Sequence, residues 1–175
     1  MKTIEAIALR QSTRSYKPEQ ISEDELQTLL TAGYAAPVGM GAYDSLNLTV
    51  VQKSDLLAKV TEAAATFYGN PKANPLYGAP TLIIVSSTVN EKAPSIGLAN
   101  GSCIVENMSL AGTDLGLGSV YLMGAIMAIN TNEELLKELA LPEGFVPVCA
   151  LAVGYPTKPL EEKANKHHIK TNIIK

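Results

Sequence analysis

The sequence predicts one domain, residues 1–175, in which helices and strands are interspersed around about four core strands. A length of 175 residues lies within the one-domain range and is sufficient to bury a core. Hydrophobic residues make up 46% of the chain and charged residues 18%, a globular rather than a disordered balance. No internal repeat, low-complexity tract or linker rich in serine and proline divides the chain.

The first forty residues carry two helical patterns. A helix is expected over about residues 3–11, with an apolar stripe formed by Ile4, Ile7 and Ala8. Residues 22–25 form a capping box, in which the hydroxyl of Ser22 serves the third helical amide and Glu25 reaches back to the cap. A second helix therefore begins here and ends near Pro37, and an irregular loop follows at residues 39–41.

Strand and helix patterns then alternate. Residues 46–51 alternate as in a half-buried strand, and Ser54 is expected to cap a helix that extends to Phe67. We next expect a loop at about residues 69–80, a central strand at 81–87 and a long helix at 94–116. A strand at 120–123, a helix at 131–140 that a second capping box opens at Thr131, and a last core strand at 145–153 follow.

The C-terminal tail is polar until Ile169, Thr171 and Ile173 alternate at strand spacing. A strand of this kind would be exposed if it were free. We therefore expect it to pair with another segment, for which a second subunit is one candidate.

Charge is distributed unevenly along the chain. The net charge is −3, yet residues 1–20 carry +2, residues 158–175 carry +3 and residues 21–157 carry −8. Such a protein lacks the broad basic face that long nucleic acid requires, so no nucleic acid is expected as a partner. The two basic ends could still assemble a small anion site if the fold brings them together.

Several kinds of chemistry lack their motifs here. The sequence has no phosphate-binding glycine loop of the Walker or dinucleotide type and no serine in a nucleophile elbow. His167 and His168 are adjacent and cannot share a metal without other ligands, so no metal site is expected. Cys103 and Cys149 lie in apolar stretches and are expected to be buried, not paired or reactive.

The same absence holds for membrane and export signals. No apolar run approaches the roughly twenty residues that cross a bilayer. The N-terminal residues also lack the apolar core of a signal peptide. We therefore expect a cytoplasmic protein with no membrane contact.

Residues 10–16, Arg-Gln-Ser-Thr-Arg-Ser-Tyr, gather two guanidinium groups and several hydroxyls where the first helix is expected to end. Arginine forks bind phosphate oxygens bidentately and serine adds a neutral donor, which makes this segment a candidate anion site. A solvated helix end is the alternative, and composition alone favours it, because basic residues are common in a last helical turn.

This segment resembles the start of the flavin-dependent nitroreductase family, whose members open with Arg-x-Ser-x-Arg-x-aromatic. Further resemblances follow in the family's order and cover nearly the whole chain. They begin with the loop after the second helix (residues 36–41) and the strand that follows it (46–51). An Ala-Pro pair with its core strand (79–85), the long helix with its Gly-Leu-Gly turn (106–119) and the last core strand (147–156) come next.

The resemblance implies an α+β fold with a mixed, mostly antiparallel central sheet flanked by helices. It also implies a homodimer that holds FMN at the subunit interface, with residues 165–175 as a C-terminal arm that pairs with the partner subunit. Tyr16 is expected to pack in the family's aromatic position. Glu106 is expected to lie on a solvated helix face, although the dimer interface and the flavin are alternatives.

The resemblance also implies roles for particular residues. Arg10 and Ser12 would bind the ribityl phosphate, with Gln11 between them. Arg14 would lie near N1 and O2 of the flavin, where a positive charge favours the anionic reduced ring. Met123 and Gly124 would lie near flavin N5, and the segment Pro37, Val38, Gly39 and Met40 would reach the flavin from the other subunit. Asn74 would be either a pyrimidine contact or a turn residue. Lys166 and His168 would close over the phosphate, with Lys163 as a competing choice.

The implied activity is that of an FMN-dependent oxidoreductase with a ping-pong mechanism. Hydride would pass from NADH or NADPH through flavin N5 to a small electrophilic acceptor, such as a nitroaromatic or a quinone. No side chain is expected to act as a catalytic nucleophile or acid–base group, because the protein positions the reactants and tunes the ring. The nicotinamide preference and the physiological acceptor stay open.

One departure from the family's pattern supports an alternative. Many members carry Asn-x-Gln-Pro-Trp after the second helix, where this chain has residues 41–45, Gly-Ala-Tyr-Asp-Ser, and it has no tryptophan at all. Together with the short length, this departure motivates a flavin-binding or flavin-storing protein with little reductase turnover. A flavin-free interaction domain is a third possibility.

Overall fold

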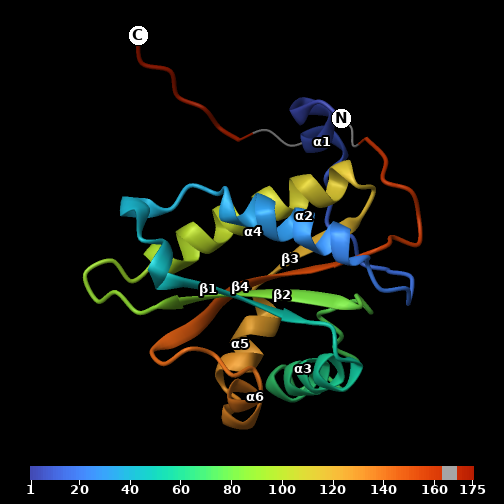
Figure 1. Cartoon of the computed structure of the whole chain (residues 1–175), viewed down its shortest axis with the longest axis vertical. Coiled ribbons are helices and arrows are strands. Elements are labelled where there is room, and N and C mark those ends of the chain that lie inside the picture. The colour runs from blue at the N-terminus through green and yellow to red at the C-terminus, as the bar shows by residue number, and fades with distance from the viewer. Residues whose placement is uncertain (163–168) are drawn as a thin grey trace.

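The computed structural model describes residues 1–162 and 169–175 (Figure 1). Its centre is a four-stranded sheet in the order β1-β2-β4-β3, built from β1 (Leu46–Val51), β2 (Thr81–Thr88), β3 (Gly118–Leu122) and β4 (Phe145–Gly154). The pairs β1–β2, β2–β4 and β3–β4 are all antiparallel, whereas an isolated bridge between Ser12 and Ser119 is parallel. The predicted α+β class with a mostly antiparallel sheet is confirmed.

Helices cover both faces of this sheet (Figure 1). On one face lie α1 (Thr3–Leu9), α2 (Glu23–Tyr34) and α4 (Ile96–Asp114). On the other lie α3 (Ser54–Phe67), α5 (Gly124–Asn130) and α6 (Glu133–Glu138). Two short 3-10 turns, Gly39–Gly41 and Tyr43–Ser45, connect α2 to β1.

The sheet separates two apolar cores, because successive side chains of a strand point to opposite faces. Leu82 and Ile84 of β2 belong to the core that includes residues of α3, α5 and α6, whereas Ile83 and Val85 belong to the core that includes residues of α2 and α4. All four are fully buried. β2 and β4 are therefore the central strands, and β1 and β3 form the two edges of the sheet.

The predicted caps are correct in one case of three. The Ser22 hydroxyl accepts a hydrogen bond from the Glu25 amide at 3.2 Å, and the Glu25 carboxylate accepts one from the Ser22 amide at 2.7 Å, which confirms that capping box. The prediction for Ser54 was wrong, since Lys53 occupies the cap position and no side chain caps α3. At α6 the cap is Asn132, not Thr131, and its side chain accepts from the Leu135 amide at 3.0 Å.

The structure corrects two further predictions about elements. The first helix ends at Leu9, and its predicted apolar stripe is not buried, since Ile4 is 74% exposed and Ile7 52% exposed. Helix α5 was not predicted, because its sequence Gly-Ala-Ile-Met-Ala-Ile-Asn is apolar on every side and shows no helical period. Within this single chain residues 169–175 form no regular element, and the pairing of the strand expected at 169–173 with a second subunit stays a prediction.

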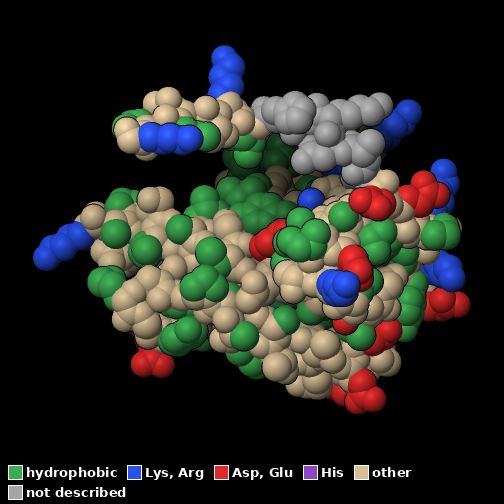
Figure 2. Space-filling view, turned by 90° about the horizontal axis from the view of Figure 1, so that it is seen from above, with side chains coloured by type: hydrophobic (Ala, Val, Ile, Leu, Met, Phe, Trp, Pro, Cys, Tyr) green, Lys and Arg blue, Asp and Glu red, His purple; other side chains and the backbone are tan. Residues whose placement is uncertain are grey.

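The tail exposes its apolar side chains: Ile169, Ile173 and Ile174 are 92%, 73% and 90% exposed. Figure 2 shows this segment standing apart from the body, with hydrophobic side chains on the part of the surface beneath it. No helix within the described residues is both long and apolar enough to span a membrane.

Candidate functional site

The segment from Arg10 to Lys17 follows α1 and lies along the free edge of β3. The Thr13 amide donates to the Ser119 carbonyl at 2.9 Å, next to the parallel bridge between Ser12 and Ser119. Further along, the Lys17 amide donates to the Tyr155 carbonyl at 2.8 Å. This segment is therefore anchored by backbone hydrogen bonds both to β3 and to the chain that leaves β4.

A glycine makes the close approach to β3 possible. An ideal Cβ placed on Gly118 would lie 2.7 Å from both Cγ2 and Oγ1 of Thr13, closer than real Cβ contacts. Any side chain at position 118 would therefore push the 10–14 segment away from the sheet edge.

The basic N-terminal segment lies beside the start of the basic C-terminal stretch. Residues Gln11, Ser12 and Arg14 line a cleft of about 550 Å³ whose other wall is residues 156–161, which include Lys158. The charge arithmetic left open whether the ends come together. The described residues bring the start of the C-terminal stretch, Lys158 with Glu161, to the segment, whereas residues 169–175 stand apart from the body. Lys158 was not predicted as a site residue, and the only signal for it was its position just beyond the last core strand.

The two arginines of the segment have different partners. The Arg10 Nε lies 3.4 Å from the Glu106 carboxylate, and both side chains are partly exposed, at 33% and 55%. Glu106 is thus on an exposed helix face, as expected, but it also pairs with Arg10, which was not expected. The Arg14 guanidinium carbon instead lies 5.8 Å from the centre of the Tyr77 ring.

Tyr16 fixes the end of the segment. Its side chain is buried, and its hydroxyl lies within hydrogen-bonding distance of the Thr13 carbonyl at 2.9 Å and of the Ala152 carbonyl at 3.4 Å. Burial raises the pKa of this phenol well above its usual value. Tyr16 therefore stays neutral and packs the segment against β4, which confirms the expectation of a packing role.

A second tie joins the segment to α2. Tyr155, whose carbonyl accepts a hydrogen bond from the Lys17 amide, also donates from its hydroxyl to Oε2 of Glu25 at 2.7 Å. Burial alone would raise the pKa of Glu25, but hydrogen bonds from the Ser22 amide and from the Tyr155 and Ser22 hydroxyls outweigh it and lower that pKa. The ionised Glu25 thus links the start of α2 to the chain beside the cleft.

Met123 and Gly124 lie at the other end of β3, four residues beyond Ser119 and so about 13 Å away at the strand rise. Met123 is 40% exposed. Its sulfur lies 3.5 Å from the Tyr121 hydroxyl, which in turn lies 3.0 Å from the Ser102 hydroxyl of α4. A Cβ on Gly124 would lie 2.7 Å from the hydroxyl of the exposed Tyr68, so a larger residue here would displace that side chain.

The loop that contains Pro37, Val38, Gly39 and Met40 lies elsewhere in the chain. It precedes β1, the sheet edge opposite β3, so one chain does not bring it to the Arg10–Arg14 segment (Figure 1). The Gly39 amide donates to Oδ1 of the buried Asn100 at 3.0 Å, which anchors this loop to α4. Met40 has a left-handed backbone (φ 58°) and is 86% exposed.

Asn74 is exposed, and its carbonyl accepts the Tyr77 amide at 3.1 Å, which is consistent with a turn residue. The alternative pyrimidine contact of its side chain stays a prediction. Lys166 and His168, together with the competing Lys163, lie outside the described residues.

The two cysteines differ. Cys149 is buried, which raises the pKa of its thiol to about 11, so it is protonated at neutral pH. The prediction that Cys103 is buried was wrong, because this residue lies on an exposed side of α4. Within residues 1–162 and 169–175, no group of three or more histidine, cysteine, aspartate or glutamate side chains could hold a metal ion.

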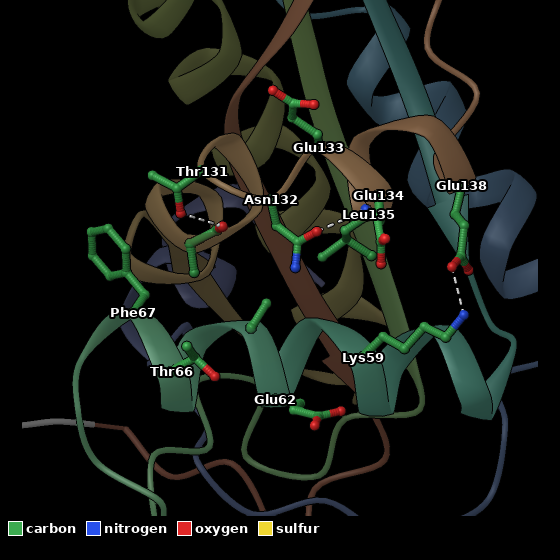
Figure 3. A pocket seen from close by; sticks show the side chains of 12 residues that line it. Lys59, Glu62, Thr66, Phe67, Thr131, Asn132, Glu133, Glu134, Leu135 and Glu138 are labelled. Atoms are coloured by element: carbon green, nitrogen blue, oxygen red, sulfur yellow. Dashed lines mark hydrogen bonds and ion pairs between the residues drawn. The ribbon is translucent and has the colours of Figure 1, made fainter.

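A second cleft lies between α3 and the α5–α6 pair and has the opposite electrostatic character (Figure 3). Its volume is about 570 Å³, and its charged lining residues are Lys59, Glu62, Glu133, Glu134 and Glu138. Lys59 pairs with Glu138. An anion would be repelled here, so of the two clefts the one beside Arg14 is suited to a phosphate.

Comparison with known proteins agrees with this geometry. The model of the nitroreductase family matches residues 7–155. An NADPH-flavin oxidoreductase of Vibrio harveyi is 28% identical over 178 residues, which cover 92% of this chain and 68% of that protein.

Solved structures are similar over nearly the full length. A nitroreductase of Bacteroides fragilis with bound FMN is 28% identical with a TM-score of 0.79, covering 98% of this chain and all of that one. A nitroreductase of Desulfitobacterium hafniense with bound FMN is 24% identical with a TM-score of 0.83, again covering 98% of this chain and all of that one. The second likeness concerns the fold alone.

Proposed function

This chain belongs to the nitroreductase family, and we propose that it binds FMN along the β3 edge and uses it to carry hydride from NADH or NADPH to a small electrophilic acceptor. The observation that carries the proposal is the meeting of Gln11, Ser12 and Arg14 with Lys158 around one cleft. The FMN bound to the Bacteroides fragilis relative supports the choice of ligand.

The donors at the cleft fit a phosphate monoester. At the cleft, the hydroxyl of Ser12 supplies neutral hydrogen bonds and Lys158 a point charge, and Glu161 is the one carboxylate in the lining. Arg10 lies outside that lining and would add charge-assisted hydrogen bonds by turning from Glu106 toward the phosphate. The pair between Arg10 and Glu106 does not prevent this, because an ion pair between partly exposed groups is worth only about 0–1 kcal/mol. A phosphate can therefore replace Glu106 as the partner of Arg10 at little cost.

The other donors suit a ring that extends along β3. Arg14 would place a positive charge beside the polar edge of the flavin ring, and the exposed Met123 with Gly124 would border the ring farther along the strand. When bound, FMN would supply the redox chemistry by accepting hydride from a nicotinamide and delivering it to a nitroaromatic, a quinone or a similar acceptor in a ping-pong cycle. The side chains named here then act by orientation and electrostatics, not as nucleophiles or acids.

A homodimer would complete the site. The loop from Pro37 to Met40 lies at the opposite sheet edge, so in this proposal the partner's copy of that loop reaches the flavin. Exposed apolar side chains on α1 and on the tail, such as Ile4 and Ile169, supply surface for the partner to cover. The predicted arm at residues 165–175 would pair with the second subunit.

The experiment is an anaerobic titration of the purified, FMN-loaded protein with NADH and with NADPH, followed by steady-state assays with a quinone and a nitroaromatic. The proposal predicts a flavin absorption spectrum, bleaching by at least one nicotinamide, and turnover with at least one acceptor. Bound flavin that neither nicotinamide reduces would favour the storage alternative. A colourless protein that takes up no added FMN would overturn the flavin assignment altogether.

A further inference from the structure

Tyr77 lies in a turn whose backbone is unusual for an aromatic residue. Its φ of 55° is in the left-handed region, which costs free energy for a bulky side chain, and Gly78 follows with φ 79°. The turn is fixed from both sides, because the buried Leu76 and Ala79 anchor it and the Ala79 amide donates to the Leu76 carbonyl at 2.9 Å. The Tyr77 ring is therefore held in place by its own turn.

Arg14 is held independently of that turn. Its neighbour Thr13 is hydrogen-bonded to β3, and the buried Tyr16 packs against β4. The contact of 5.8 Å between the Arg14 guanidinium carbon and the centre of the Tyr77 ring thus joins two separately fixed pieces of backbone. This distance lies within the range of a cation–π interaction.

An arginine held by an aromatic ring differs from an ion-paired arginine in which hydrogen-bond donors stay free. A guanidinium is planar, and its N–H donors lie in that plane. A carboxylate partner occupies these donors, as Glu106 does at Arg10. An aromatic ring accepts none of the conventional hydrogen bonds that a carboxylate does, restricts a side chain that otherwise has many rotamers, and so leaves donors available to a ligand.

We propose that Tyr77 is a positioning residue for Arg14: its ring holds the guanidinium at the cleft with its donors open to oxygen acceptors of the bound flavin nucleotide. This inference rests on the proposed function, since it assigns Arg14 to that ligand. The ring, not the phenolic hydroxyl, carries the role. The steric cost of φ 55° at Tyr77 is consistent with a conformation kept for function.

The test compares Tyr77→Phe, which keeps the ring, with Tyr77→Leu, which keeps apolar bulk at the same φ but removes the ring. FMN affinity is measured by flavin fluorescence for both, alone and in an Arg14→Ala background. We expect Tyr77→Phe to bind like the wild type and Tyr77→Leu to bind about two- to fivefold more weakly. In the Arg14→Ala background, Tyr77→Leu should cause no further loss. An equal loss in both backgrounds, or a loss in Tyr77→Phe as large as in Tyr77→Leu, would overturn the proposal.

A second readout needs no flavin. In protein labelled with ¹⁵N at arginine, the Nε–Hε resonance of Arg14 should show a ring-current shift that persists in Tyr77→Phe and disappears in Tyr77→Leu. A resonance that is the same in all three proteins would mean that the ring does not hold Arg14. Should the wild type bind no FMN, the proposed function fails, and this shift alone then decides whether Tyr77 positions Arg14.

Discussion

The N-terminal segment 10–17 and the C-terminal tail 169–175 are both basic, but the first is packed against the sheet and the second extends away from it (Figure 1). The first is tied to β3 and to the residues after β4 through Thr13 and Lys17. The second forms no regular element and leaves Ile169 and Ile174 about nine-tenths exposed. The first half of the proposed site is therefore complete within one chain, whereas the tail leaves apolar side chains that a second chain could cover.

Removal of residues 165–175 is the largest intervention on this contrast. If the partner buries the three isoleucines, their loss removes roughly 4–9 kcal/mol of apolar burial. At one and the same concentration we expect the full chain to sediment as a dimer and the truncated chain as a monomer. Removal of Lys175 alone is the matched control and should leave the dimer intact. A truncated protein that is as stable a dimer as the full chain would contradict the arm.

Arg10→Ala tests whether the anchored segment 10–17 binds the phosphate of FMN. It removes a charge-assisted hydrogen bond and should weaken FMN binding by about 1.5–3 kcal/mol, measured by calorimetric titration. Glu106→Gln is the control, because it removes the competing carboxylate and keeps Arg10. That variant should bind FMN at least as tightly as the wild type. Unchanged affinity in Arg10→Ala would remove Arg10 from the site.

Gly118→Ala tests whether close packing on β3 holds the segment. The added methyl group collides with Thr13 and should reduce the free energy of unfolding by about 1–3 kcal/mol, together with FMN affinity. Denaturant unfolding provides the measurement. Thr13→Gly introduced into the same chain removes the colliding atoms and should recover part of the loss. A Gly118→Ala protein with wild-type stability and affinity would show that the segment is not set by this contact.

The smallest effect concerns the Glu25 link. Because the pKa of Glu25 is lowered in the folded chain, its carboxylate contributes stability above the ordinary pKa of about 4.3, and that contribution is lost as pH falls through the lower folded value. Glu25→Gln should cost about 1 kcal/mol at neutral pH, the size of a capping interaction. The difference from the wild type, followed by denaturant unfolding, should shrink in acid. A difference independent of pH would speak against an ionised Glu25 in this role.

Patterns that are local in sequence predicted most of the fold. The capping box at Ser22 and the apolar run of β2 each depend on residues within a few positions of one another in the sequence, and both are confirmed. Helix α5 was not predicted because its exposed side carries the apolar Met127 in place of a polar residue, so the sequence shows no helical period. The exposure of Cys103 escaped because apolar neighbours in sequence do not indicate which side of a long helix faces the core.

The site shows the same division between local and distant information. The Arg10–Tyr16 motif could be recognised in the sequence, and the family that it resembles is the one whose model matches residues 7–155. The contributions of Lys158, Tyr77 and Glu106 were not predictable, because each reaches the segment only through contacts across the fold.

The most direct measurement of the central claim compares FMN with riboflavin, which lacks only the phosphate, in calorimetric titrations of the wild-type protein. If the 10–14 segment binds the phosphate, FMN should bind roughly ten- to a hundredfold more tightly than riboflavin, and Arg10→Ala should remove most of that preference. Equal affinities of the wild-type protein for FMN and riboflavin would contradict a phosphate site at this segment.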